Sequence, residues 1–293
     1  MKIVIADEME KEVVSKIAEL GTIIYKPSDL KKELLDADAL VVRSATKVTR
    51  EVIMGSRIKI VARAGVGVDN IDQEACKKQG IKILNTPGAS TNAVAELVVG
   101  LMIGALRNIQ KAHHQMKGSK WEKKSLLGRE IDGKTLGIIG YGRIGASVAK
   151  KASALGMKIV AYNPPPRHED GVKYIDDLPT FLNEADVITL HAALTPETKN
   201  IINNQTIAKM KNGVVIINTA RGEMVDENAL YDAIKSGKVS SAAIDVYREE
   251  PYKGKLVDLE NVYLSPHLGA STKEAQERIG EELVAVLKKE LGK

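Results

Sequence analysis

The stretch from Thr135 to Gly145, which reads TLGIIGYGRIG, decides the fold of this chain. An apolar run ends at a Gly-x-Gly-x-x-Gly pattern, and a segment with helical spacing follows it. In such a unit the first glycine permits a tight turn, the second lets the backbone approach a pyrophosphate, and the third packs helix against strand. The phosphates lie at the N-terminus of that helix. The stretch therefore predicts a parallel α/β domain with a dinucleotide site at Gly140, Gly142 and Gly145.

Strand patterns alternate with helical patterns on both sides of this stretch, which is typical of doubly wound parallel sheets. Five strand patterns precede residue 90, and six lie between residues 135 and 264. Residues 93–107 are apolar almost all round and predict a buried linking helix. A capping-box pattern at Ser271 predicts a final helix. We expect two Rossmann-like α/β domains with a cleft between them: residues 1–90 plus 270–293 bind the substrate, and residues 91–269 bind the dinucleotide.

The composition favours a soluble enzyme or binding protein. Of the 293 residues, 44% are hydrophobic and 28% charged, close to the averages of globular proteins. The longest uncharged apolar run, residues 97–106, is about half a membrane span, so we expect no membrane partner. Because the net charge of +5 is a small difference between 43 basic and 38 acidic residues, and aromatics are only 3%, we expect no nucleic acid. The lone Cys76 favours the cytoplasm, and no metal site is expected.

Charged and polar residues follow most strands of the second series. Ligands bind outside the carboxyl ends of parallel strands, so we expect these residues to line one site. They include a cation for a substrate carboxylate, a histidine for proton transfer and acids to orient it, which are the parts that hydride transfer needs. The spacing alone leaves Glu249 and Glu250 both open. The segments are His191-Ala192-Ala193, Thr219-Ala220-Arg221-Gly222, Asp245, Glu249-Glu250-Pro251 and Ser265-Pro266-His267-Leu268-Gly269.

Asn163 ends the second strand of this series, at the position where an acid usually holds the adenosine ribose. A neutral amide supplies no charge to repel a 2′-phosphate, and Arg167 and His168 nearby carry groups that attract one. The choice between NAD and NADP therefore stays open at this point.

The first domain shows polar strand ends as well. Arginines and glycine-rich turns provide charge-assisted and backbone donors, which predict an anion site facing the cleft. The alternative is that both arginines pair with surface acids. The segments are Arg43-Ser44, Arg63-Ala64-Gly65-Val66-Gly67 and Asn85-Thr86-Pro87-Gly88.

Four segments also resemble the D-2-hydroxyacid dehydrogenase family, and within it the phosphoglycerate branch. They are residues 42–49 (VRSATKVT), 65–72 (GVGVDNID), 134–137 (KTLG) and 265–272 (SPHLGAST). The resemblance implies that Arg221, Glu250 and His267 form the catalytic set, and it selects Glu250 over Glu249. It also implies that Asp245 binds the nicotinamide amide.

The expected contacts combine the strand-end positions with this matching. Val66 occupies a position near the cofactor at which members of the resembled family often carry a threonine. The expected cofactor contacts are Gly140, Gly142, Arg143, Ile144, Gly145, Asn163, His191, Thr219, Ala220, Arg221, Asp245, His267 and Gly269. The expected substrate contacts are Arg43, Ser44, Arg63, Gly65, Val66, Gly67, Arg221 and His267.

The resemblance implies an NAD-dependent oxidation of 3-phospho-D-glycerate to 3-phosphooxypyruvate, the first step of serine biosynthesis. A glyoxylate or hydroxypyruvate reductase stays open within the family. A dinucleotide-sensing corepressor stays open from another class, because a fold does not fix a function. Residues 108–129, with Trp121, resemble the arm through which relatives dimerise, so we expect a homodimer with a small anionic substrate. The chain stops after the final helix, so no C-terminal regulatory domain is expected.

Overall fold

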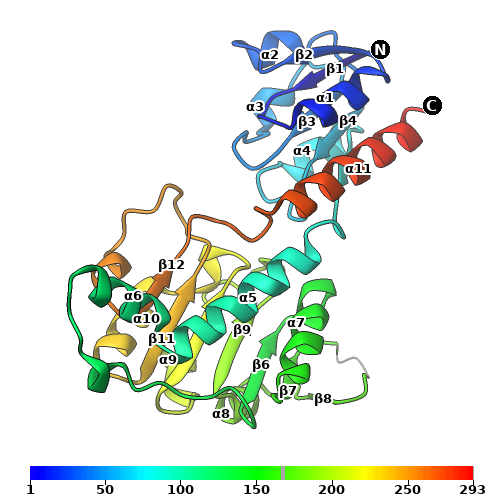
Figure 1. Ribbon diagram of the computed structural model, residues 1–293. Coiled ribbons are helices and arrows are strands. Elements are labelled where there is room, and N and C mark those ends of the chain that lie inside the picture. Colours follow the sequence, from blue (N-terminus) through cyan, green and yellow to red (C-terminus); the bar gives the residue numbers. More distant parts are fainter. Residues whose placement is uncertain (166–168, 293) are drawn as a thin grey trace. The chain divides into compact units, whose positions relative to one another are not determined.

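The computed structural model describes residues 1–165 and 169–292. The chain divides into two compact units (Figure 1). Unit 1 comprises Met1–Ser90 and Ser271–Lys293, and unit 2 comprises Thr91–Ala270. Each unit is built on one parallel sheet, which confirms the predicted α/β class.

Unit 1 contains a five-stranded sheet in the order β2-β1-β3-β4-β5. All four positions of β3 are buried, which fits the uninterrupted apolar run of a central parallel strand. The strands are β1 (Lys2–Ile5), β2 (Thr22–Tyr25), β3 (Ala39–Val42), β4 (Ile60–Arg63) and β5 (Lys82–Asn85). The helices are α1 (Lys11–Ala18), α2 (Leu30–Glu33), α3 (Arg50–Ile53), α4 (Gln73–Lys78) and α11 (Lys273–Glu290).

The final helix, α11, packs on unit 1 along α1, β4 and β5. Thr272 is its N-cap, since the backbone is extended there and Oγ1 accepts from Ala275 N at 3.1 Å. The helix therefore begins one residue later than the pattern at Ser271 predicts, and the expected capping box is wrong, because Ala275 at N3 has no side chain that could bond back to the N-cap. The final helix itself is as predicted, and its apolar side chains at helical spacing are all buried: Ala275, Ile279, Leu283 and Leu287.

Unit 2 contains a seven-stranded sheet in the order β12-β11-β10-β9-β6-β7-β8. The strands are β6 (Thr135–Ile139), β7 (Lys158–Tyr162), β8 (Val172–Tyr174), β9 (Val187–Leu190), β10 (Val214–Asn218), β11 (Val239–Ile244) and β12 (Val262–Leu264). The sequence predicts six of these strands. It misses β8, because three partly exposed residues at a sheet edge leave no periodic pattern.

The helices of unit 2 surround this sheet (Figure 1). The α-helices are α5 (Thr91–Leu106), α6 (Ile109–Lys117), α7 (Arg143–Ala154), α8 (Leu178–Glu184), α9 (Asn204–Lys209) and α10 (Glu227–Lys235). The short 3₁₀ turns are η1 (Lys123–Leu126), η2 (Gly222–Met224) and η3 (Lys255–Asp258). Across the described residues, no single helix is long and apolar enough to span a membrane; α5 and α6 pass that test only as a pair bent by 65°.

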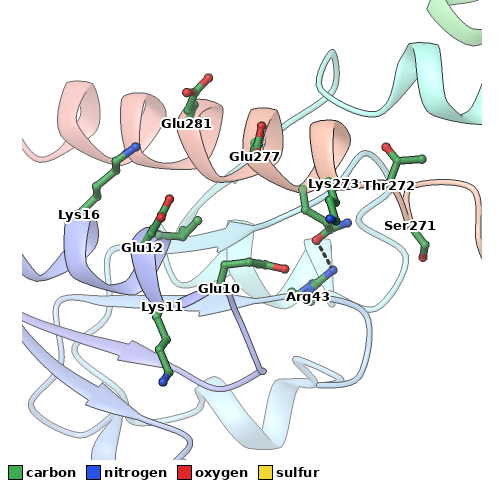
Figure 2. Close-up of a pocket in the computed structure, with 12 residues that line it drawn as sticks. Glu10, Lys11, Glu12, Lys16, Arg43, Ser271, Thr272, Lys273, Glu277 and Glu281 are labelled. Atoms are coloured by element: carbon green, nitrogen blue, oxygen red, sulfur yellow. Dashed lines mark hydrogen bonds between the residues drawn. The ribbon is translucent and has the colours of Figure 1, made fainter.

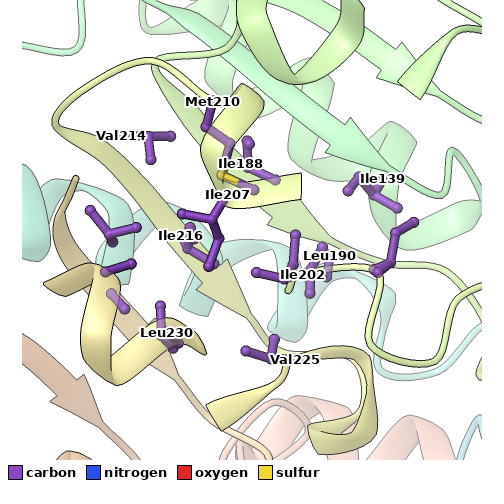
Figure 3. Packing of buried hydrophobic residues seen from close by; sticks show 14 of the residues in the cluster. Ile139, Ile188, Leu190, Ile202, Ile207, Met210, Val214, Ile216, Val225 and Leu230 are labelled. Atoms are coloured by element: carbon purple, nitrogen blue, oxygen red, sulfur yellow. The ribbon is translucent and has the colours of Figure 1, made fainter. Parts of the chain in front are cut away.

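One core of unit 2 lies where β9 and β10 meet the helices that follow them. Ile188, Ile216, Ile207 and Leu230 pack there with other apolar side chains (Figure 3). The chain continues from β6 to β7 and β8 on one side, and β9 begins the series on the other. Ligands of such sheets bind at this reversal of strand order, which here lies at the carboxyl ends of β6 and β9.

Candidate functional site

The loop between β6 and α7 places two motif glycines where a larger residue would clash. Gly140 has a φ of +91°, and a Cβ on it would lie 2.4 Å from the backbone nitrogen of Ala192. A Cβ on Gly145 would lie 2.4 Å from the carbonyl oxygen of Gly140. A Cβ on Gly142 would meet nothing within 4 Å, so open space adjoins the start of α7. This is the shape that brings a pyrophosphate close to the backbone.

The N-terminus of α7 has no side-chain cap, because the N-cap residue, Gly142, has no side chain. Its first amide N–H groups are therefore available to an anion, which the helix dipole also favours. Arg143 is exposed in the first turn, and Ile144 is partly buried against the core.

Asn163 follows β7 and braces the glycine loop. Its Oδ1 accepts from Tyr141 N at 2.8 Å, and its Nδ2 donates to Pro165 O at 2.8 Å. One lone pair and one N–H remain, so the expected ribose contact stays a prediction. Arg167 and His168 lie outside the described residues.

His191 and Thr219 follow β9 and β10. The Nε2 atom of His191 lies 2.9 Å from Thr189 Oγ1, and burial lowers the pKa of His191 to about 3, so the ring is neutral. The hydroxyl of Thr219 is buried and has no hydrogen-bond partner within residues 1–165 and 169–292. A polar ligand would satisfy such a hydroxyl. Together with the glycine loop and the uncapped helix, it fits a nicotinamide dinucleotide.

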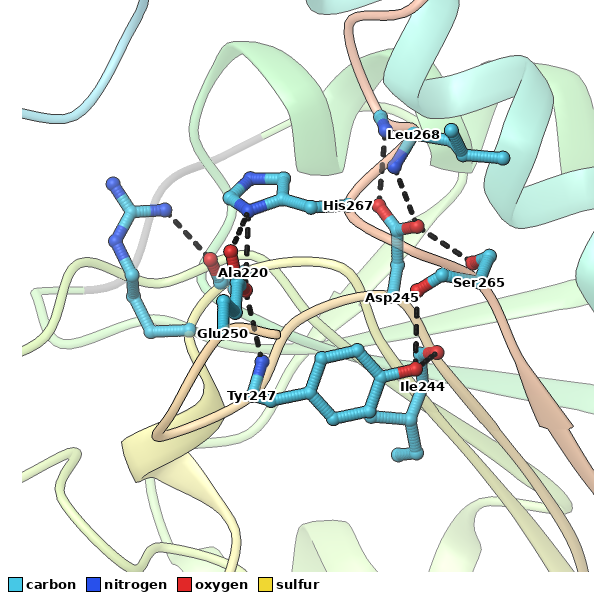
Figure 4. Close-up of polar contacts among 10 residues, drawn as sticks. Ala220, Ile244, Asp245, Tyr247, Glu250, Ser265, His267 and Leu268 are labelled. Atoms are coloured by element: carbon cyan, nitrogen blue, oxygen red, sulfur yellow. Dashed lines mark hydrogen bonds and ion pairs between the residues drawn. The ribbon is translucent and has the colours of Figure 1, made fainter. Parts of the chain in front are cut away.

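The side chains of His267 and Glu250 are hydrogen-bonded at the same edge of the sheet (Figure 4). The Nδ1 atom of His267 lies 3.0 Å from Glu250 Oε2 and 3.2 Å from Oε1. A carboxylate at Nδ1 favours the tautomer with its proton there, which leaves Nε2 of the neutral ring as an acceptor. The side chains are 44% and 40% exposed, so a ligand can reach the pair.

Asp245, fully buried after β11, holds the turn that carries His267 (Figure 4). Its carboxylate accepts from Ser265 Oγ at 2.6 Å, Leu268 N at 2.7 Å and Gly269 N at 2.9 Å. The N–H of His267 donates to the backbone oxygen of Asp245 at 2.9 Å. These bonds hold His267 at φ +55°, a left-handed conformation that costs about 1–2 kcal/mol outside glycine. The nicotinamide contact expected of Asp245 stays a proposal.

Arg221 lies just after β10 in a turn fixed by the buried Asn218. Asn218 Oδ1 accepts from Ala220 N at 3.0 Å, and its Nδ2 donates to Arg221 O at 2.8 Å. The Nη1 atom of Arg221 donates to Ala220 O at 2.6 Å. The amide of Asn218 therefore holds the backbone of Ala220 and Arg221, and Arg221 is the cation expected to bind a substrate carboxylate.

In unit 1, Arg43 lines a pocket of about 770 Å³ between α1 and the start of α11 (Figure 2). Its Nη2 donates to Gln276 Oε1 at 2.6 Å, and its Nη1 donates to Glu8 O at 3.3 Å. The carboxylate of Asp7 accepts from Arg43 N at 2.5 Å and from Thr46 Oγ1 at 2.5 Å. The loop after β3 is thus rigidly held, and Ser44 is exposed on it.

Arg63 is the last residue of β4 rather than the residue after it, and it lies beside the strand that precedes Arg43. Its guanidinium lies against Gly65, where a Cβ would come within 2.6 Å of Nη1. The turn through Val66 and Gly67 is held by Asn85, whose Nδ2 donates to Val66 O at 2.6 Å. The two expected arginines therefore belong to neighbouring strand ends of one sheet.

Residues 99–269 match the family model described as D-isomer specific 2-hydroxyacid dehydrogenase, NAD binding domain. This chain belongs to the D-2-hydroxyacid dehydrogenase family. The unit 2 loop and strand ends described above therefore belong to an NAD-binding domain. Within the described residues, no cluster of three or more His, Cys, Asp or Glu side chains suits a metal ion.

Similar proteins of this dehydrogenase family carry more than one name. The chain is 54% identical to hydroxypyruvate reductase of Thermotoga maritima over 90% of this chain and 88% of that protein. It is 46% identical to D-3-phosphoglycerate dehydrogenase of Methanocaldococcus jannaschii over 99% of this chain, but it spans only 57% of that protein. The crystal structure of a glyoxylate reductase from Paecilomyes thermophila superposes with a TM-score of 0.92 at 34% identity, covering 100% of this chain and 96% of that one.

Two residues that shape these sites in the dehydrogenase escape the sequence reasoning. Asn218 ends the apolar run VVIIN, and a lone amide at a strand end was the available signal. Gln276 lies in the first turns of α11 with no local pattern to distinguish it. Only the contact with Arg43 singles it out.

Proposed function

We propose that this dehydrogenase oxidises 3-phospho-D-glycerate to 3-phosphooxypyruvate with NAD, the first step of serine biosynthesis, in the cytoplasm. The observation that carries the proposal is the pair of His267 Nδ1 and Glu250 Oε2, 3.0 Å apart, at the sheet edge that also bears the glycine loop. The phosphoglycerate dehydrogenase named above, similar over 99% of this chain, supports the substrate. When bound, NAD supplies the acceptor for the hydride.

The proton moves at His267 in this proposal. Its Nε2 removes the proton of the C2 hydroxyl during oxidation, and the imidazolium returns it to the keto oxygen during reduction. Glu250 fixes the ring through Nδ1 and stabilises the imidazolium. Arg221 binds the substrate carboxylate, for which a guanidinium has the matching two-pronged geometry.

We assign the phosphate to the arginines of unit 1, above all to Arg43. Two of its five donors are used by Gln276 and Glu8, which leaves three for an anion. Lys273 lines the same pocket at the start of α11 and adds positive charge. A phosphate meets charge-assisted hydrogen bonds there.

A hydroxypyruvate reductase is the second candidate, and two observations favour it. The relative with that name is 54% identical and is matched over 88% of its length. The pocket of Arg43 also contains carboxylates, including Glu10, Glu12 and Glu277, which oppose a phosphate and tolerate a less charged substrate.

The deciding experiment compares kcat/KM for 3-phosphooxypyruvate and hydroxypyruvate, each with NADH, in the wild type and in Arg43→Ala. Loss of one charged hydrogen-bond donor lowers kcat/KM about ten- to a hundredfold, and we expect that loss for the phosphorylated acid alone. Lys16→Ala, on the same pocket, is the matched control and should change neither value more than about threefold.

Two results would redirect the assignment. A wild-type kcat/KM that is higher for hydroxypyruvate than for 3-phosphooxypyruvate would favour the second candidate. Equal losses for both acids in Arg43→Ala would remove the phosphate from Arg43.

We also propose a homodimer formed through residues 108–129. This segment exposes four large apolar side chains, Ile109 (53%), Met116 (54%), Trp121 (80%) and Leu127 (89%). Large exposed apolar patches mark interaction surfaces, so we assign these side chains to the contact with a second copy of the chain.

A further inference from the structure

The hydroxyl of Tyr247 contacts the carboxyl ends of β11 and β12, the strands that precede Asp245 and His267 (Figure 4). Its hydroxyl lies 2.9 Å from the carbonyl oxygen of Ile244 and 3.0 Å from that of Ser265. Those two atoms belong to the ends of β11 and β12. A single phenol proton is therefore shared between two strand ends at nearly equal distances.

The backbone of Tyr247 makes the remaining connections. Its N–H donates to Glu250 Oε1 at 3.2 Å. Its carbonyl carbon packs against Gly222, the residue after Arg221, so closely that a Cβ on Gly222 would lie 2.1 Å away. The turn that carries Arg221 thus packs against Tyr247.

The hydroxyl of Tyr247 reaches His267 through one shared acceptor. The carbonyl oxygen of Ser265 accepts from Tyr247 Oη and also from His267 N, which lies 3.0 Å away. Movement of this carbonyl displaces the turn in which His267 is held. On the other side, the Tyr247 N–H holds the carboxylate that binds the ring of His267.

The ring of Tyr247 is held in place by stacking, so the position of its hydroxyl is well defined. It stacks on Tyr252 with ring centroids 4.3 Å apart and planes at 21°. Burial raises the pKa of Tyr247 to about 12, and Asp245 adds to the rise, so the phenol stays protonated and donates at neutral pH.

We infer that the Tyr247 hydroxyl is a positioning group that sets the distance between His267 and Glu250 for proton transfer. This inference rests on the proposed roles of those two residues. The hydroxyl does not touch the reacting atoms; it holds the two backbone segments that do the positioning. A small displacement of a reacting group is enough to lower a rate by one or two orders of magnitude.

Removal of the Tyr247 hydroxyl leaves a second hydrogen-bond donor on each of its two carbonyl acceptors, so an effect on catalysis can be separated from an effect on stability. The carbonyl of Ile244 still accepts from Ser265 N at 3.0 Å, and the carbonyl of Ser265 still accepts from His267 N. Tyr247→Phe therefore orphans no buried acceptor and keeps the stacking on Tyr252.

The test compares Tyr247→Phe with Tyr252→Phe, a matched loss of a phenol hydroxyl from the same stack. The hydroxyl of Tyr252 accepts from Leu256 N at 3.1 Å, away from the His267 turn. We expect Tyr247→Phe to lower kcat for the faster of the two oxoacids about tenfold. The Kd of NADH should match that of Tyr252→Phe, and the Tm of Tyr247→Phe should not fall below that of Tyr252→Phe, which loses the acceptor of Leu256 N. The solvent isotope effect on kcat should rise because proton transfer becomes slower.

Two further measurements make the outcome decisive. The ring protons of His267, assigned by their loss in His267→Asn, should shift in the NMR spectrum of Tyr247→Phe and not in that of Tyr252→Phe. If kcat and these signals are alike in the two phenylalanine variants, both assayed well below their Tm, the positioning role is wrong. If His267→Asn keeps the wild-type kcat, the proposed function fails at His267 and the inference fails with it.

Discussion

Replacing Glu250 with glutamine removes one negative charge from the ring of His267 and keeps the length of the side chain. In the structure, Glu250 Oε2 lies 3.0 Å from His267 Nδ1, and Glu250 Oε1 accepts from Tyr247 N. The amide oxygen of glutamine can still accept from Tyr247 N, so the loop keeps its anchor. What is lost is the attraction between a carboxylate and the imidazolium that forms during oxidation.

The size of that loss follows from distance and exposure. Two unit charges about 4 Å apart attract by about 4 kcal/mol at an effective dielectric constant near 20. The side chains of His267 and Glu250 are 44% and 40% exposed, so solvent screening reduces this value. A hydrogen bond to a charged group contributes about 1.5–3 kcal/mol, which predicts a fall in kcat of roughly ten- to a hundredfold.

The assay follows NADH formation and consumption by absorbance with saturating substrate, and Glu249→Gln is the matched control. Glu249 carries the same charge one residue earlier along an exposed turn. We expect Glu249→Gln to keep kcat within about twofold of the wild type, because an exposed charge contributes little. If Glu250→Gln and Glu249→Gln give the same kcat, the orienting role of Glu250 is refuted.

Three further outcomes are expected. Asn163→Asp should raise the preference for NADH over NADPH in kcat/KM about tenfold, because a carboxylate repels the 2′-phosphate of NADPH. The second carboxylate oxygen can still accept from Tyr141 N, so the glycine loop keeps its contact. An unchanged ratio would show that this side chain does not reach the ribose. Burial lowers the pKa of His191 to about 3, so the unfolded chain takes up its proton first, and the wild type should lose about 2 kcal/mol of stability between pH 6.5 and 4.5. Chemical denaturation should show a smaller loss in His191→Gln, and equal losses would contradict a neutral ring in the folded protein. If the wild type forms the proposed homodimer, Trp121→Glu should dissociate it in sedimentation analysis, whereas the same mass for variant and wild type would exclude Trp121 from the proposed interface.

Local sequence patterns were sufficient to predict the α/β fold class and a dinucleotide-binding domain. The glycines of TLGIIGYGRIG act through the backbone of a single turn, and strand and helix periodicities report which face of each element is buried. The pairing of Glu250 with His267 also followed from motif matching. The structure places these two side chains in contact at the carboxyl edge of the sheet.

Only the tertiary structure decided which partners the functional side chains have. Arg43 donates to Gln276, 233 residues away, and Tyr247 donates to the carbonyl oxygen of Ser265, 18 residues away. The edge strand β8 forms only because β7 offers it a partner. Hydrophobic periodicity indicates which residues of one segment are buried, but a hydrogen bond between two segments depends on their relative positions in the folded unit. Those positions are fixed by the packing of the whole unit, which no local sequence pattern records.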